Sequence, residues 1–152
     1  MSEGPSLEGP SLEGPSLYEA DILLWSEEQA ELLRRRAANQ LDWENLAEEI
    51  GDVGRSELRA LHSHLIQALL HDLKAEAWPL SRDVDHWRAE ARGHRADARR
   101  CYTPSMAQRT DVETLYQDAR RRLPATLDGT RPLPVPENCP VTLAELLSEP
   151  ED

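Results

Sequence analysis

Two acidic clusters are the residues of this chain whose types and spacing could hold a metal ion. Glu27, Glu28 and Glu31 follow one another at helical spacing, and Glu49 and Asp52 lie three residues apart further along the chain. Residues three apart share a helix face, so two antiparallel helices could bring these carboxylates together. Converging carboxylates suit hydrated Mg²⁺, which prefers oxygen ligands. We favour the alternative, a solvated acidic face, because charged residues normally cover the outer face of bundle helices.

A second candidate site combines a carboxylate with histidines. Glu57, His64 and His71 recur every seven residues and therefore share one helix face. Carboxylate and imidazole groups suit Zn²⁺ or Fe²⁺. Seven helical residues rise about 10.5 Å, so a partner helix would have to add ligands, and His94 is a candidate. We favour the simpler interpretation, in which these histidines are hydrogen-bonded residues at the edge of a bundle core.

A basic stripe is formed by Arg88, Arg92, Arg95 and Arg99, which recur at spacings of four and three. Between Ser81 and Leu123, ten Arg outnumber seven Asp and Glu, whereas the whole chain has a net charge of -12. The stripe could contact nucleic-acid phosphates. We favour internal pairing with acidic helices instead, because an acidic chain repels polyanions.

The segments that position these side chains are predicted to be helices. Pro79 ends one helical pattern, and Thr142 with Glu145 forms a capping box for a short C-terminal helix. Five prolines between 124 and 140 exclude a regular element there, and its apolar residues predict a segment that packs over the bundle. We therefore predict an all-α bundle of four main helices, over about 18–38, 43–78, 81–101 and 112–123, with a short helix over 143–147.

The apolar spacing also predicts which residues form the core. Asp42 is the expected cap of the second main helix. Gly51 and Gly54 predict a kink or a close approach of another helix. The predicted core residues near the N-terminus are Ile22, Trp25, Gln29, Leu32 and Leu33 in the first helix and Trp43, Leu46, Ile50 and Val53 in the second.

Length and composition set the wider bounds. A chain of 152 residues with 39% apolar residues, four Trp and no Phe is large enough for one domain, which we place at 18–147. The unit Glu-Gly-Pro-Ser-Leu occurs three times over 3–17, so 1–17 is predicted to be a disordered tail, and 148–152 an acidic tail. Two cysteines outside any CxxC motif predict free thiols. Without a membrane-length apolar run or a signal pattern, the cytoplasm is the expected location.

The chain resembles domain-of-unknown-function family 29, a family of small, all-helical, mostly bacterial proteins. The resemblance covers most of 18–147. The chain departs from the family pattern after Lys74, where Ala75 to Pro79 replace a Trp-Gln-Tyr-Gln-Pro-like run. The resemblance implies an all-α fold, but it does not indicate any particular activity. The matching pieces are Tyr18 with Asp21, Trp25 with Gln29 to Leu33, Asp42 to Ile50, Gly54 to Glu57, His71 to Lys74, Trp87, Tyr116 with Ala119, and Asn138 to Thr142.

Two function classes remain open. The first, which we favour, is a structural or protein-interaction module that acts through a protein partner or self-association, without a cofactor, nucleic acid or a membrane. The second follows from the acidic motif EExxE followed by ExxD, which is similar to that of all-α nucleotide pyrophosphohydrolases of the MazG type. That resemblance implies Mg²⁺ held against a nucleotide's phosphates by Glu27, Glu28, Glu31, Glu49 and Asp52.

Overall fold

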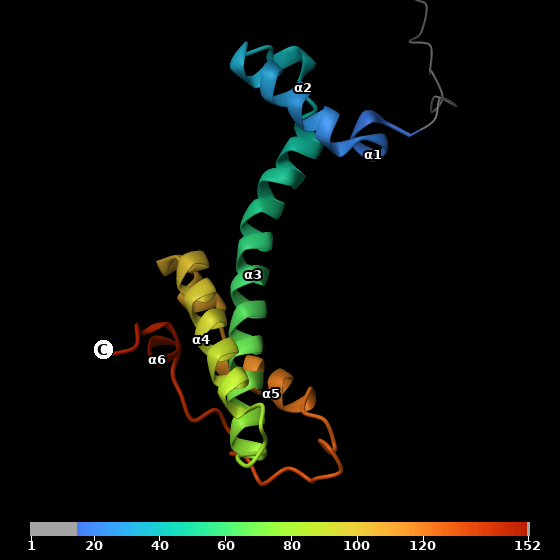
Figure 1. The fold of residues 1–152 in the computed structure, drawn as a ribbon. Helices are drawn as coiled ribbons and strands as arrows, with labels where there is room; N and C mark the ends of the chain where they lie inside the picture. The colour runs from blue at the N-terminus through green and yellow to red at the C-terminus, as the bar shows by residue number, and fades with distance from the viewer. Residues whose placement is uncertain (1–14, 152) are drawn as a thin grey trace, which may run out of the picture. The chain divides into compact units, whose positions relative to one another are not determined.

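The computed structural model describes residues 15–151, and within them it contains helices and a single isolated β-bridge (Figure 1). The predicted all-α fold class is confirmed. The first fourteen residues, which carry most of the predicted disordered tail, lie outside the described residues. The elements are α1 (Leu17–Ala20), α2 (Ile22–Arg34), α3 (Trp43–Ala77), α4 (Val84–Cys101), α5 (Val112–Arg121) and α6 (Leu143–Leu147), with 3₁₀ helices η1 (Ala38–Gln40) and η2 (Pro104–Arg109).

The chain divides into two compact units, Met1–Asp52 and Val53–Asp152. The first unit holds α1, α2, η1 and the first part of α3, and the second holds the rest. The single domain expected over 18–147 stays a prediction.

In the first unit, the helix expected over 18–38 is split at Asp21. The side chain of Asp21 caps α2 by accepting a hydrogen bond from the Leu24 amide at 3.0 Å. The buried face of α2 consists of Trp25, Gln29 and Leu32, three residues that the apolar spacing placed in the core. Gln29 is tolerated there because its Oε1 accepts a hydrogen bond from the Asp42 amide at 2.8 Å.

Asp42 connects the two helices of this unit. Its carboxylate accepts hydrogen bonds from the Trp25 indole at 3.2 Å and from the Asn45 side-chain amide at 2.8 Å. The Asn45 backbone amide lies 3.5 Å from the other carboxylate oxygen, in the position expected of a cap. These hydrogen bonds, that of the Asn45 side chain first, lower the pKa of Asp42.

Several residues predicted to be core are exposed instead. Trp43 and Ile50 are 63% and 69% exposed, and Val53 is 65% exposed. Ile22 and Leu33 on α2 are also about half exposed. The prediction was wrong because α2 is buried along Trp25, Gln29 and Leu32 alone, and these five side chains lie off the covered faces.

A Cβ added at Gly54 would meet nothing within 4 Å, so no helix of the described chain approaches it closely.

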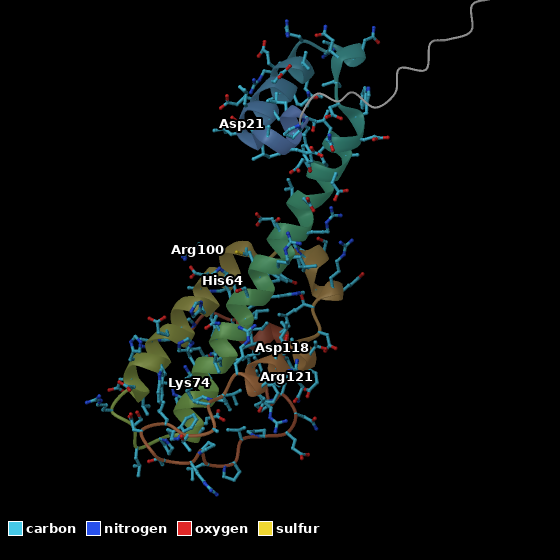
Figure 2. All side chains as sticks on the ribbon, turned by 90° about the vertical axis from the view of Figure 1, so that its right-hand side faces the viewer. Asp21, His64, Lys74, Arg100, Asp118 and Arg121 are labelled. Atoms are coloured by element: carbon cyan, nitrogen blue, oxygen red, sulfur yellow. The ribbon has the colours of Figure 1, made fainter. Side chains whose placement is uncertain are left out.

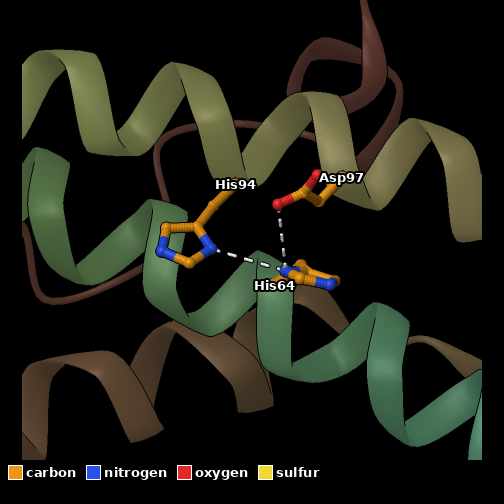
Figure 3. Close-up of side chains that lie close together, drawn as sticks. All are labelled: His64, His94 and Asp97. Carbon is orange, nitrogen blue, oxygen red and sulfur yellow. Dashed lines mark hydrogen bonds and ion pairs between the residues drawn. The ribbon is translucent and has the colours of Figure 1, made fainter.

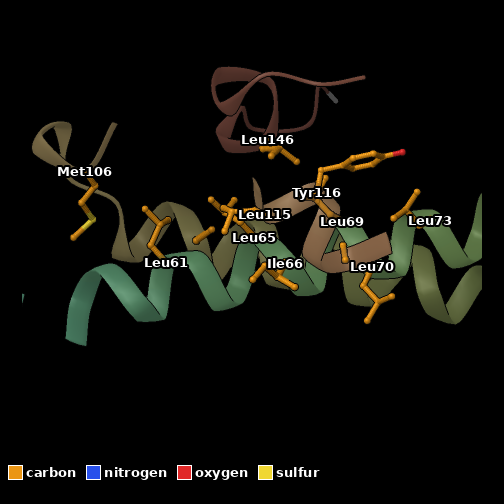
Figure 4. Packing of buried hydrophobic residues seen from close by; sticks show 12 residues of the cluster. Leu61, Leu65, Ile66, Leu69, Leu70, Leu73, Met106, Leu115, Tyr116 and Leu146 are labelled. Atoms are coloured by element: carbon orange, nitrogen blue, oxygen red, sulfur yellow. The ribbon is translucent and has the colours of Figure 1, made fainter. Parts of the chain in front are cut away.

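The core of the second unit is built on the leucine stripe of α3 (Figure 4). Leu61, Leu65 and Leu69 recur every four residues and point into the cluster. The other elements contribute fewer residues each. The full cluster consists of Leu61, Leu65, Ile66, Leu69, Leu70, Leu73, Ala98, Met106, Leu115, Tyr116, Ala119 and Leu146.

The proline-rich segment after α5 packs on this unit, as predicted. The Leu133 amide donates a hydrogen bond to the Ala77 carbonyl at 2.9 Å. Three side chains of α5 also donate hydrogen bonds to carbonyls of this segment, Tyr116 to Pro136 and Gln117 and Arg120 to Glu137. The capping box at Thr142 forms and starts α6.

The helices α3 and α4 run antiparallel after a short turn that contains Pro79. Asp72 of α3 pairs with both Arg88 and Arg95 of α4, which fixes the register of the two helices. Figure 2 labels His64 and Lys74 along α3, and Arg100 near the end of α4. Among the described residues, no helix is both long and apolar enough to cross a membrane.

Candidate metal centre

Three side chains from α3 and α4 form a group with metal-ligand chemistry. His64 lies on α3, and His94 and Asp97 lie on α4, where their spacing of three residues puts them on one face (Figure 3). One ligand atom from each of the three lies within 4.8 Å of the other two. The His64 Nδ1 is 3.4 Å from the His94 Nδ1 and 3.9 Å from an Asp97 carboxylate oxygen.

These spacings are close to those of a tetrahedral zinc site. With Zn–N bonds of 2.0–2.1 Å, two nitrogen ligands of one ion lie about 3.3 Å apart. The separation between the His64 and His94 nitrogens therefore needs almost no adjustment. The Asp97 oxygen lies 3.9 Å from the His64 nitrogen and within 4.8 Å of the His94 ligand atom, so it must move closer to both to share the ion.

The surroundings orient the two imidazoles. The His71 ring stacks on His94, with ring centroids 5.6 Å apart. The Nδ1 of His71 donates to the Gln67 carbonyl at 2.7 Å, which fixes the orientation of that ring. On the far side of the His94 ring, Nε2 lies 3.9 Å from a Glu90 carboxylate oxygen. A carboxylate behind a histidine ligand is the usual arrangement around a metal ion.

The protonation state also favours metal binding. Burial, and then the neighbouring His71 and His64, lower the pKa of His94. A lowered pKa keeps the imidazole neutral, and the neutral form is the one that ligates a metal. The three side chains remain 25–36% exposed, so an ion can reach them from solvent.

Sequence reasoning identified part of this centre. It singled out His64 and His71 and named His94 as the residue a partner helix could add, and the structure brings these three histidines together. It also included Glu57, which is exposed and does not belong to the group. Asp97 was missed, although its spacing of three residues from His94 was visible in the sequence.

Comparison with known proteins places the chain in a family. The family model described as "Domain of unknown function DUF29" matches residues 17–150. The chain belongs to the DUF29 family. A solved structure of an alpha-helical protein of unknown function from Rhodospirillum rubrum is 30% identical to this DUF29 protein, with a TM-score of 0.65. The alignment covers 90% of this chain and 92% of that one. No curated protein matches the sequence.

The five carboxylates proposed for Mg²⁺ take different positions in this DUF29 chain. Glu27 and Glu28 are exposed, and Glu31 pairs with Arg34 and Arg35 at 3.6 and 3.7 Å. Glu49 and Asp52 are half-buried. No three of the five place ligand oxygens within 4.8 Å of one another. Magnesium binding there stays a prediction, and neither comparison supports a nucleotide pyrophosphohydrolase.

Glu49 has a defined role inside the first unit of the DUF29 protein. The Tyr18 hydroxyl donates a hydrogen bond to its carboxylate at 2.6 Å. Together with burial and the nearby acidic residues, this hydrogen bond raises the pKa of Tyr18 to about 12. Tyr18 also packs edge-on against the Trp25 ring, 5.0 Å away, so Tyr18 links α1 to α3 through Glu49 and to α2 through Trp25.

The arginine stripe of the DUF29 protein is mostly occupied by internal contacts. Arg88 and Arg95 pair with Asp72, and Arg99 donates to the Ser148 carbonyl at 3.1 Å. Internal pairing with an acidic residue of another helix is confirmed for Arg88 and Arg95, whereas Arg99 contacts a backbone carbonyl instead. Arg92 differs, because it makes no ion pair or hydrogen bond with any residue in 15–151.

Proposed function

We propose that this protein binds a transition-metal ion, with Zn²⁺ held between α3 and α4 by His64, His94 and Asp97. One observation carries the proposal: two imidazoles and a carboxylate from neighbouring helices bring their ligand atoms within 4.8 Å. Nitrogen ligands with one carboxylate suit Zn²⁺ better than Mg²⁺, which takes oxygen ligands. Three protein ligands leave a fourth position on the ion for water.

The test is zinc binding by the metal-free chain. We expect Zn²⁺ to raise the melting temperature after treatment with EDTA and dialysis, because a ligand that binds the folded state stabilises it. At a free Zn²⁺ concentration of about 100 times Kd, the stabilisation is about 2.7 kcal/mol. Isothermal titration calorimetry on the same sample should give one ion for each chain.

Matched histidine variants identify the ligands. His64→Gln and His94→Gln should each remove the zinc response. His86→Gln should retain it, because His86 is an exposed residue of α4 outside the cluster. A zinc response in His64→Gln equal to that of the wild type would show that the ion binds elsewhere. In that case the contact between His64 and His94 is a structural hydrogen bond.

A second function is favoured by exposed apolar side chains of the first unit. Trp43 and Ile50 on α3 and Ile22, Leu23 and Leu24 on α2 are each at least 50% exposed. Exposed apolar groups of this size typically mark protein contacts. The side chains support the interaction module expected from the sequence, with self-association as its simplest form.

The free thiols of Cys101 and Cys139 suit the reducing cytoplasm, the location that the sequence predicts.

Self-association is measurable by sedimentation velocity. We expect the wild-type sedimentation coefficient to rise with concentration, and the rise to disappear in the double variant Trp43→Ala/Ile50→Ala. Each side chain is more than 60% exposed, so the variant should keep its fold. A control with Leu133→Ala removes another half-exposed apolar side chain, from the second unit. A wild type that sediments as a monomer at all concentrations rejects self-association.

A further inference from the structure

A separate cavity of about 300 Å³ lies beside the metal centre, in the second unit of the chain. Arg88, Arg92 and Arg95 of α4 line one side of it, and Asp72 and Glu76 of α3 line another. The lining also includes Leu69 and Leu73 of α3 and Tyr116 of α5, so the cavity has apolar as well as charged lining residues. Its volume lies at the small end of the range for ligand pockets, so the cavity can hold a ligand of the size of a small metabolite.

The charges that line this cavity do not balance. The lining contains three guanidinium groups and two carboxylates, so its net charge is +1. Arg88 and Arg95 also share a single carboxylate, that of Asp72. A guanidinium carries five donors and an ionised carboxylate accepts up to about four hydrogen bonds, so two guanidiniums exceed what Asp72 can satisfy.

Two of the arginines retain unused hydrogen-bonding capacity. Arg92 lines the cavity and makes no hydrogen bond or ion pair with any residue that the structure describes. The Nε of Arg95 is buried and has no hydrogen-bond partner in the same part of the chain. A buried donor without a partner costs free energy that a bound acceptor recovers. The buried Nε of Arg95 therefore lacks an acceptor. Arg92 is an exposed residue that lines the same cavity, so its donors are available to a ligand as well as to water.

We propose that this cavity binds a small phosphate monoester, with the phosphate on Arg92 and Arg95 and the organic part against the leucines of α3. Arginine forks match the geometry of phosphate oxygens and form charge-assisted hydrogen bonds. The phosphate competes with Asp72 for Arg95, which turns that guanidinium so that Nε also donates. Asp72 then keeps its contact with Arg88.

The test uses inorganic phosphate as the probe and the full, metal-free chain. Binding is measured by isothermal titration calorimetry at fixed ionic strength, with sodium chloride replacing phosphate in the reference. We expect Arg92→Gln to weaken binding about tenfold to a hundredfold, since a hydrogen bond to a charged group has that effect on Kd. Arg92→Lys keeps the positive charge but loses the forked guanidinium. Its affinity for phosphate should therefore lie between those of the wild type and Arg92→Gln.

The control variant is Arg121→Gln, on α5, which removes the same charge outside the cavity. Arg121 is exposed and pairs with Asp118 of the same helix (Figure 2). It should bind phosphate like the wild type. Equal weakening in Arg92→Gln and Arg121→Gln would overturn the proposal, because it would show a response to net charge alone. Binding of malonate without binding of phosphate would also overturn it, since it would assign the cavity to carboxylates.

Discussion

Replacing Leu65 with alanine is expected to lower the free energy of unfolding by about 2–5 kcal/mol. Leu65 is fully buried in the centre of the α3 stripe and packs in the largest apolar cluster of the second unit (Figure 4). The alanine variant loses the burial of the leucine side chain and leaves a cavity that neighbouring residues fill only in part. A loss of this size is a large fraction of the total stability of a small domain.

The matched control is Ile50→Ala, on the same helix. Ile50 is 69% exposed, so its removal should change the free energy of unfolding by no more than about 0.5 kcal/mol. Both values come from urea denaturation followed by circular dichroism, at a protein concentration low enough to exclude association. A loss in Ile50→Ala as large as that in Leu65→Ala would mean that Ile50 is covered in solution.

Replacing Trp25 with alanine is expected to unfold the first unit and leave the core of the second intact. Trp25 is 4% exposed, contacts Tyr18 edge-on and donates a hydrogen bond to Asp42. Loss of a buried tryptophan costs about 3–5 kcal/mol. Residues 15–52 form a unit too small to hold that much stability alone, because units below about 40 residues bury little surface.

Hydrogen exchange resolves this result by position. In Trp25→Ala, amides of α2 should lose protection while those of residues 61–73 in α3 keep it. The control Trp43→Ala removes the same side chain where it is 63% exposed, and it should leave α2 protected. Equal loss of protection in both units would instead show one cooperative domain over 18–147, as the sequence predicts.

The helices and the core of the second unit could be predicted from the sequence because they depend on local patterns. The spacing of Leu61, Leu65 and Leu69 defines a buried face, and the capping box at Thr142 defines the start of α6. The same pattern was wrong for Trp43 and Ile50. Periodicity shows which residues share a helix face, but it does not show whether another element covers that face.

The candidate metal centre was predictable in part for a related reason. The position of Asp97 relative to His94 follows from one helix, but its approach to His64 depends on the register between α3 and α4. That register is set by contacts such as those of Asp72 with Arg88 and Arg95, which the sequence pattern does not specify. The cavity that Arg92 lines depends on the same helix pair and on the later segment that closes it.

The way in which the proline-rich segment is attached affects how its sequence can vary. Tyr116, Gln117 and Arg120 of α5 all donate to backbone carbonyls, those of Pro136 and Glu137. Every amino acid supplies that carbonyl, so these attachments do not depend on the side chains at positions 136 and 137. Substitution there can proceed without detaching the segment, whereas the three donors on α5 have no such freedom.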